Sequence, residues 1–267
     1  MTRPIPILLY HGVDPDPPAA LGSFVIRPDR FAEHMALLAE RGFTALTVSG
    51  LCDLIDLGGP LPDDLVLVTF DDGLADFGRH AWPIVRDAGL VATLYVVSGY
   101  VGQHADWLTP FGAPPAMLDW DEVAALDADG CEIGAHSVTH PELDTLGSAE
   151  LVDQVRSSRA QLGSRLGHPI RSFAYPHGYH GPKVKAVTAK AGYDSACAVR
   201  NMLSSTDDDR FALARVTIGA DCDVAELGRI LDGAHLPVAP RREQLRTKGW
   251  RAYRRTRRRF ESSRVPA

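Results

Sequence analysis

The sequence predicts an α/β protein in which a largely parallel sheet is covered by helices, either as an open sheet or as a (β/α) barrel. Three observations lead to this prediction. Short apolar runs rich in β-branched residues alternate repeatedly with segments of helical periodicity. The 267 residues, of which 45% are apolar, suffice to bury the core of one domain. Polar residues follow the expected strands, at the ends where both architectures collect their chemistry.

The first five elements are expected in the order strand, helix, strand, strand, helix. "IPILLY" (5–10) is a short apolar run, and residues 28–42 carry apolar side chains at helical spacing. "TALTV" (44–48) has the composition of a short strand. "LVLVTF" (65–70) is apolar on both faces, as a buried parallel strand would be, and residues 78–89 repeat the helical pattern.

The alternation then continues along the chain. The longest stretch without periodicity, residues 98–119, is expected to form a loop, and loops of that length often serve function. The further strands are expected at 91–97, 131–136 and 171–175, and the further helices at 120–130, 148–167 and 181–192.

Charge divides the chain near residue 240. Residues 241–267 hold 11 basic and two acidic side chains, a net charge of +9. Residues 1–240 hold 17 basic and 32 acidic side chains, a net charge of −15. We therefore expect one folded domain over 1–240, followed by a basic tail over 241–267 with a separate role.

The tail is open to three interpretations. As a helix it would carry Trp250, Tyr253 and Phe260 as a narrow stripe among arginines, which is typical of a helix lying on an anionic membrane surface. Nucleic-acid binding is less favoured, because the acidic body would repel phosphates and no nucleic-acid motif occurs. A disordered basic extension is the third interpretation.

The compartment is expected to be the cytoplasm, with peripheral contact at the inner face of the membrane if the tail binds lipid. No stretch approaches the roughly 18–20 apolar residues of a membrane span, and the N-terminal apolar run is too short for a signal peptide. The four cysteines are far apart and form no C-x-x-C pair, so we expect them to be reduced and structural. They are Cys52, Cys131, Cys197 and Cys222.

Carboxylates and imidazoles follow several strands. Each group alone has an ordinary explanation: Asp-Asp-Gly suits a turn, and a lone histidine pair is as often structural as metal-binding. Their shared place at the ends of parallel strands favours a common site. The residues are His11 after 5–10, Asp71 and Asp72 after 65–70, His136 and His140 at the end of 131–136, and Pro176 and His177 after 171–175.

Two imidazoles and one carboxylate form a three-ligand site for a divalent metal. Zn²⁺ is preferred for such a set, and Co²⁺, Ni²⁺ or Mn²⁺ would also fit. The second aspartate would stay free to take a proton from the attacking water, whose pKa the cation lowers. A dication would also offset the repulsion between the adjacent carboxylates.

Three motifs carry a resemblance to a known family. "TFDDG" (69–73), "HSVTHP" (136–141) and "FAYPHG" (173–178), in this order, resemble the polysaccharide deacetylase family, carbohydrate esterase family four, over roughly residues 5–220. The resemblance implies a distorted (β/α) barrel, with 1–240 as the catalytic domain. It also implies a divalent metal and hydrolysis of an N-acetyl, or sometimes an O-acetyl, group from sugars.

The resemblance also implies roles for individual residues. Asp71 would be the general base, and Asp72, His136 and His140 would be the metal ligands. The backbone N–H of His177, directly after Pro176, would help to hold the oxyanion. Pro176 and Tyr175 would contact the sugar, Tyr175 being the aromatic residue inside the motif.

Two departures from the family pattern concern catalysis. Ala174 stands where many members have an arginine, and Arg215 in "LARVTI" (213–218) would either replace it beside Asp71 or lie on the surface of its strand. The late Leu-x-His motif is missing after residue 200. The opening "ILLYHGV" (7–13) resembles the branch that deacetylates poly-N-acetylglucosamine, which implies that His11 is the general acid.

The function expected from these residues is deacetylation of an N-acetylated sugar, glycan or lipid-linked saccharide, releasing acetate and a free amine. Two alternatives remain. One is a C–N hydrolase of the same fold that acts on a non-sugar amide or a cyclic imide. The other is a carbohydrate-binding relative that has lost catalysis, which the intact set of candidate residues disfavours.

Overall fold

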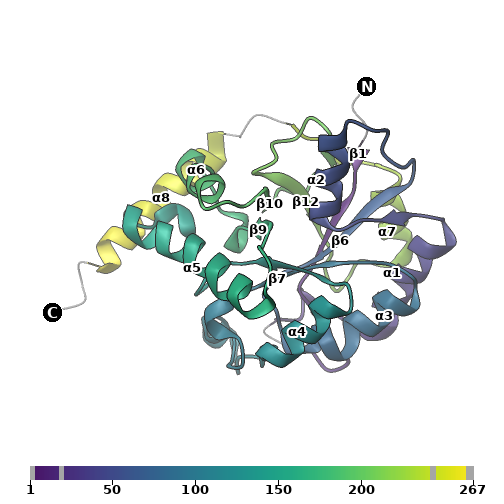
Figure 1. Ribbon diagram of the computed structural model, residues 1–267, viewed down its shortest axis with the longest axis horizontal. Helices are drawn as coiled ribbons and strands as arrows, with labels where there is room; N and C mark the ends of the chain where they lie inside the picture. The colour runs from purple at the N-terminus through teal and green to yellow at the C-terminus, as the bar shows by residue number, and fades with distance from the viewer. Residues whose placement is uncertain (1–3, 18–20, 241–244, 263–267) are drawn as a thin grey trace.

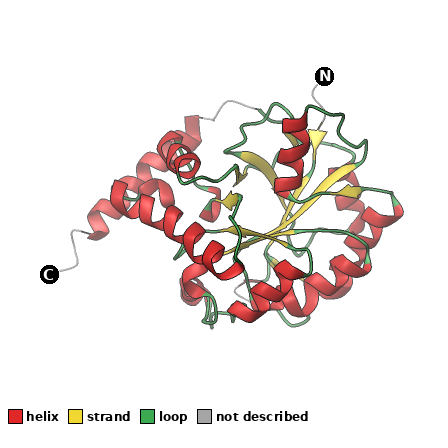
Figure 2. Cartoon of the chain, in the orientation of Figure 1, coloured by secondary structure: helices red, strands yellow, loops and turns green. Residues whose placement is uncertain are grey.

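The computed structural model describes residues 4–17, 21–240 and 245–262, and its centre is a closed barrel of parallel strands (Figure 1). The ring closes because β2 pairs with both β12 and β6. Helices surround the strands, as Figure 2 shows, and the predicted (β/α) barrel is confirmed. In ring order the strands are β2 (Ile7–Tyr10), β12 (Leu213–Thr217), β10 (Ser195–Val199), β9 (Ser172–Ala174), β8 (Glu132–Ala135), β7 (Thr93–Val96) and β6 (Leu65–Phe70).

The shorter strands lie outside this closed ring. β5 (Thr44–Ala45) pairs with the start of β6. It is shorter than the predicted strand over 44–48 because Thr47 caps a helix, accepting a hydrogen bond from Gly50 N–H on its side chain. The remaining short strands are β1 (Pro4–Ile5) with β11 (Ser204–Ser205), and β3 (Gly12–Val13) with β4 (Val25–Ile26).

The five predicted helices are confirmed, with ends shifted by a few residues. Helix α4 has a full capping box, in which Asp119 accepts from Glu122 N–H and Glu122 accepts from Asp119 N–H. Helices α2 and α7 were not predicted from the sequence. The helices around the barrel are α1 (Pro28–Glu40), α2 (Val48–Leu57), α3 (Trp82–Asp87), α4 (Trp120–Ala128), α5 (Ser148–Leu166), α6 (Pro182–Lys190) and α7 (Val224–Leu231), with a π-helical turn η2 (Phe77–Ala81) before α3.

Apolar side chains form two clusters on the two faces of the barrel wall. Leu8 and Phe70 belong to the large cluster between the strands and the helices. Ile7 and Leu67, on the opposite face of the same two strands, belong to a smaller cluster inside the barrel. Successive side chains along a strand point to opposite faces of the barrel wall, which produces this division. Because both faces are buried, each strand needs apolar residues at almost every position.

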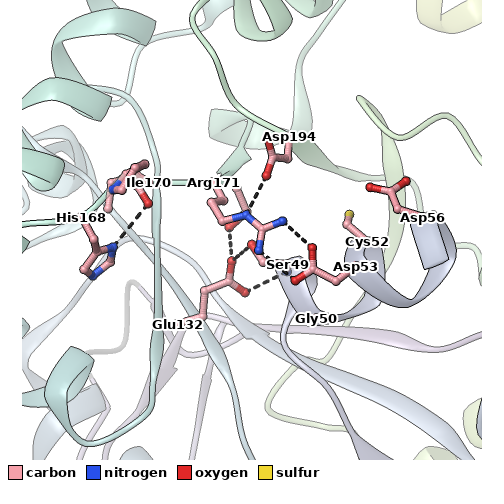
Figure 3. A network of polar contacts seen from close by, with 12 residues as sticks. Ser49, Gly50, Cys52, Asp53, Asp56, Glu132, His168, Ile170, Arg171 and Asp194 are labelled. Carbon is pink, nitrogen blue, oxygen red and sulfur yellow. Dashed lines mark hydrogen bonds and ion pairs between the residues drawn. The ribbon is translucent and has the colours of Figure 1, made fainter.

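A polar network closes the N-terminal end of the barrel, opposite to the ends that carry the predicted site. The Glu132 carboxylate at the start of β8 accepts hydrogen bonds from the hydroxyls of Thr93, Ser172 and Ser49, and from Ser49 N–H. Figure 3 shows this carboxylate beside Arg171. The Arg171 guanidinium bridges two carboxylates, those of Asp53 and Asp194.

Much of the basic tail is helical. Helix α8 (Leu245–Ser262), yellow in Figure 1, lies at the edge of the body near α6. The disordered interpretation is therefore wrong for these residues, and the boundary at residue 240 stays a prediction. The side chain of Phe260 lies outside the described residues. Within the described part of the chain, no helix combines the length and apolar composition needed to cross a bilayer, and contact with a membrane surface remains a prediction.

Glu132 provides a test of the polar network. Glu132→Gln should lower the free energy of unfolding by about 1–3 kcal/mol, because an amide nitrogen would face hydroxyl groups that now donate to a carboxylate oxygen. Chemical denaturation measures the loss, with Glu40→Gln at the exposed end of α1 as the control. Equal effects of the two substitutions would contradict a structural role for the network.

Candidate active site

The strand ends deliver the predicted polar residues to one cavity of about 390 Å³. His11 follows β2, Asp71 and Asp72 follow β6, and His136 follows β8. Asp71 N–H donates to the Tyr10 carbonyl oxygen at 3.1 Å, so the ends of β2 and β6 stay in register where they reach the cavity. The residues of the predicted site that line it are His11, Asp71, Asp72, His136, His140 and His177.

Asp71 is held by a buried arginine. Arg215, fully buried on β12, donates from both terminal nitrogens to the two Asp71 carboxylate oxygens at 2.7 Å each. It therefore lies in the barrel beside Asp71 and not on the surface of its strand. Burial alone would raise the pKa of Asp71, but the charge and hydrogen bonds of Arg215, together with the nearby His136 and His11, outweigh it and the pKa lies below its ordinary value. Asp71 is thus an ionised, oriented carboxylate at neutral pH.

Asp72 faces two imidazoles. One ligand atom from each of Asp72, His136 and His140 lies within 4.8 Å of the others. Asp72 Oδ1 lies 3.6 Å from His136 Nε2 and 3.3 Å from His140 Nε2. Among the described residues this buried oxygen has no hydrogen-bond partner.

The orientation of His136 is suited to metal binding. Its Nδ1 lies 2.8 Å from the Ala174 carbonyl oxygen, so Nδ1 carries the proton and Nε2 presents its lone pair toward Asp72. Burial lowers the pKa of His136 to about 4, which keeps the ring neutral as a ligand must be.

The carboxylate of Asp72 is unstable without a counter-charge. Burial, together with the nearby carboxylates of Asp71 and Asp76, raises its pKa to about 8. A divalent cation between this oxygen and two neutral imidazoles would remove the penalty for ionisation. The donor set, its spacing and its unpartnered oxygen therefore fit a metal ion.

The loop that bears the two histidines is braced by α5. Gln154 accepts from the N–H groups of Val138 and Thr139 on one side-chain oxygen, and the Ser137 hydroxyl accepts from His140 N–H. Motif reasoning did not identify Gln154, because it lies on a helix outside every motif. The available signal in the sequence was its position among the apolar residues on one face of the helix, such as Leu151 and Val155.

Four residues around the cavity have a left-handed backbone although none is glycine. Asp72, Ser137, His140 and His177 have φ values of 77°, 66°, 58° and 57°. Such conformations cost about 1–3 kcal/mol each and collect at functional sites. Here they turn the chain sharply where each strand ends.

His177 and Pro176 lie in η6 (Pro176–Gly178), the turn after β9. The His177 ring lines the cavity and lies 4.6 Å from the His140 ring, centroid to centroid. Gly178 is required here, because a Cβ at this position would lie 2.6 Å from the Val199 backbone nitrogen. Pro176 is buried and is not among the residues lining the cavity.

His11 lines the cavity together with Asp71 and Asp72. Its Nδ1 is buried and has no hydrogen-bond partner among the described residues, and its ring lies 5.3 Å from that of Phe24. Burial lowers the pKa of His11, and the Asp71 carboxylate partly opposes that effect. The His11 side chain thus forms part of the cavity wall without a hydrogen bond on Nδ1 to fix its ring.

The structure does not bring Tyr175 to the cavity. Its side chain is fully buried and its hydroxyl donates to the Phe211 carbonyl oxygen at 2.9 Å. Contact of Tyr175 with the sugar was predicted from the motif alone. The structure instead directs this side chain into the apolar layer between the strands and the helices. Trp107 lines the cavity instead, stacked on the His140 ring at 4.8 Å.

Comparison with known proteins agrees with this geometry. The family model described as polysaccharide deacetylase matches residues 58–196, more than half of the chain. A Bacillus subtilis protein, YxkH, named provisionally as a polysaccharide deacetylase, is 22% identical over 85% of this chain and 76% of its own length. The Escherichia coli poly-β-1,6-N-acetyl-D-glucosamine N-deacetylase is 29% identical over 39% of this chain, a match that spans 15% of that protein.

A solved structure supports the fold. The Streptococcus pyogenes deacetylase PplD, in complex with acetate, superposes with a TM-score of 0.76 at 22% identity, covering 86% of this chain and 99% of that one. The family match includes the strand that precedes Asp71 and the segments that carry His136, His140 and His177. On this match, and with a barrel of the same fold, the chain belongs to the polysaccharide deacetylase family.

Proposed function

We propose that the chain is a metal-dependent deacetylase that hydrolyses the N-acetyl group of an acetylated saccharide to acetate and a free amine. One observation carries the proposal: a metal-binding set of Asp72, His136 and His140 lies directly beside an ionised Asp71 fixed by Arg215. Names of relatives support the substrate class, because they include a poly-β-1,6-N-acetyl-D-glucosamine N-deacetylase and a chitin deacetylase.

Asp71 is the general base in this proposal. It lines the cavity, and Arg215 holds both of its oxygens in a fixed plane. It takes a proton from the water that attacks the acetyl carbonyl carbon. The lowered pKa keeps it ionised at neutral pH, at some cost in its strength as a base.

His11 is the general acid, donating a proton to the departing amine nitrogen. The register between β2 and β6 holds it next to Asp71, so the base and the acid approach the substrate from adjacent strand ends. The His177 N–H, in the turn after β9, stabilises the oxyanion as the carbonyl carbon becomes tetrahedral. Trp107 walls the cavity over His140 and limits access of bulk water.

Asp72, His136 and His140 would hold the metal, with Zn²⁺ as the first expectation for a set of two imidazoles and one carboxylate. When bound, the cation supplies Lewis-acid polarisation of the acetyl carbonyl. The Ala174 carbonyl oxygen contributes indirectly, because it fixes the ring of His136.

Release of acetate tests the activity. The purified chain, with and without added Zn²⁺, Co²⁺, Ni²⁺ or Mn²⁺, is incubated with N-acetylglucosamine oligomers linked β-1,4 or β-1,6, and with non-sugar acetamides. Metal-dependent release from saccharides supports the proposal. Release from the non-sugar amides alone, or from no compound at all, would refute it.

Metal content tests the ligand set. His136→Ala should lose most of the divalent metal that the wild-type chain retains, about one ion per chain, because one of three protein ligands is gone. Elemental analysis of folded protein gives the measurement. His168→Ala removes a half-exposed histidine that pairs with Asp127 on the surface, and it should leave metal content unchanged.

The two adjacent aspartates should behave differently. Asp71→Asn should keep the metal and lose nearly all turnover, whereas Asp72→Asn should lose both, because Asp72 alone is a proposed ligand. Circular dichroism must first show that Asp71→Asn folds, since the change leaves Arg215 without its anionic partner. Equal metal retention by the two variants would show that the roles are assigned wrongly.

The general acid is tested by the leaving group. His11→Ala should lower kcat on an N-acetyl saccharide by about 100- to 10,000-fold with little loss of metal. An aryl acetate needs less protonation as its bond breaks, so the same variant should recover much of the rate on that ester. A deficit of the same size on ester and amide would remove His11 from this role.

A further inference from the structure

A second cavity adjoins the candidate active site. Its volume is about 600 Å³, within the range of sites that take a small ligand. It shares His177 and Val199 with the active-site cavity. One wall is the chain from Gly178 to Pro182, and another is helix α8 with Trp250, Arg251 and Arg254. A ligand that extends from the active site past His177 would therefore enter a space that the basic tail completes.

Helix α8 is fixed firmly enough to form such a wall. Arg254 is buried, and its guanidinium donates to the Asp144 carboxylate at 2.6 Å. The same guanidinium stacks on the Tyr179 ring, 3.4 Å from the centroid. Arg255 donates from Nε to the Asp144 carbonyl oxygen at 2.7 Å. Asp144 and Tyr179 belong to the segments that follow His140 and His177, so the helix is anchored to both rims of the site.

The charges in the cavity are nearly balanced, with four basic side chains and three carboxylates in its wall. Each lysine or arginine in its wall has a carboxylate partner: Lys185 pairs with Asp209, Arg200 with Asp208, and Arg251 and Arg254 share Asp144. A wall of paired charges offers hydrogen-bond donors and acceptors with only a small excess of positive charge. This chemistry suits a neutral ligand with many hydroxyl groups better than a phosphate.

An aromatic ring borders the same space. Trp250 is half-exposed and its Nε1 lies 3.4 Å from the Tyr179 hydroxyl oxygen. The indole is also stacked on Tyr253, which is equally exposed but is not among the residues that line the cavity. An exposed, supported ring beside paired polar groups presents an apolar face to the C–H face of a sugar and polar groups to its hydroxyls.

We propose that this cavity binds a neutral sugar unit next to the one that is deacetylated, with Trp250 as its platform. This inference rests on the proposed function and deepens it by assigning the neighbouring sugar unit to a cavity that helix α8 of the basic tail completes. Helix α8 serves as part of the saccharide-binding surface, and Arg251, Arg254 and Arg255 serve mainly as its anchors.

The dependence of activity on the length of the substrate tests the proposal, with the whole protein in its metal-loaded form. We measure kcat/KM for N-acetylglucosamine oligomers of one to five units. For the wild type, kcat/KM should rise by roughly tenfold or more once a unit can occupy the second cavity. Trp250→Ala should reduce the ratio of the trimer value to the monomer value by roughly fivefold to tenfold, chiefly through KM. Leu57→Ala removes an exposed apolar side chain on α2 that does not line the cavity, and it should keep that ratio.

The outcomes separate this inference from the proposed function. No dependence on length in the wild type, or equal losses in the Trp250 and Leu57 variants, would overturn the second-cavity proposal while leaving deacetylation intact. If no saccharide releases acetate, the proposed function fails, and binding is then measured by calorimetry in an Asp71→Asn background. Tighter binding of the trimer than of the monomer, reduced by Trp250→Ala, would still support the sugar site, and equal affinities would refute it.

Discussion

The pairing of β2 with β6 is the constraint on which the candidate site depends. It closes the barrel, and its register places Tyr10 opposite Phe70, so the next residues, His11 and Asp71, leave the wall side by side. Since every strand in the ring is parallel to its neighbours, the ends of β8 and β9 reach the same rim. Groups more than a hundred residues apart in sequence thus meet because one pair of strands joins the first strand of the ring to its last.

The barrel also resolves the repulsion between two adjacent carboxylates by giving each a different partner. Asp71 is neutralised from inside the barrel by Arg215, whose own burial requires that carboxylate. Asp72 turns through a left-handed backbone toward His136 and His140, where a cation is needed to keep it ionised. A single Asp-Asp sequence thereby supplies one acceptor of protons and one ligand, with pKa values shifted in opposite directions.

Local motifs were predictable from the sequence, and contacts across long distances were not. Asp71, Asp72, His136, His140 and His177 each follow a recognisable strand, so parallel strand order alone brings them together. Tyr175 was interpreted wrongly because a motif says nothing about the face on which an aromatic ring lies. Arg215 was named as a candidate, but only the packing of β12 shows that its guanidinium reaches Asp71.

The basic tail illustrates the same limit. Its composition indicated an anionic partner, and the structure supplies one inside the chain: Asp144, which lies 110 residues from Arg254 in sequence and accepts its hydrogen bond. Helix α2 was missed because "TALTV" reads as a strand, whereas a single side chain at Thr47 starts a helix. Such capping choices depend on one hydrogen bond and leave little trace in hydrophobic periodicity.

The left-handed residues around the cavity affect how this protein can change over time. Four non-glycine residues in that conformation each lower the free energy of unfolding, which for most domains is only about 5–15 kcal/mol. A barrel with such strained turns has a smaller reserve against mutations elsewhere. Substitutions far from the cavity that an unstrained relative would tolerate should lower the folded population, and with it the cellular abundance. The backbone strain in four turns beside the cavity therefore limits which substitutions the outer helices can tolerate.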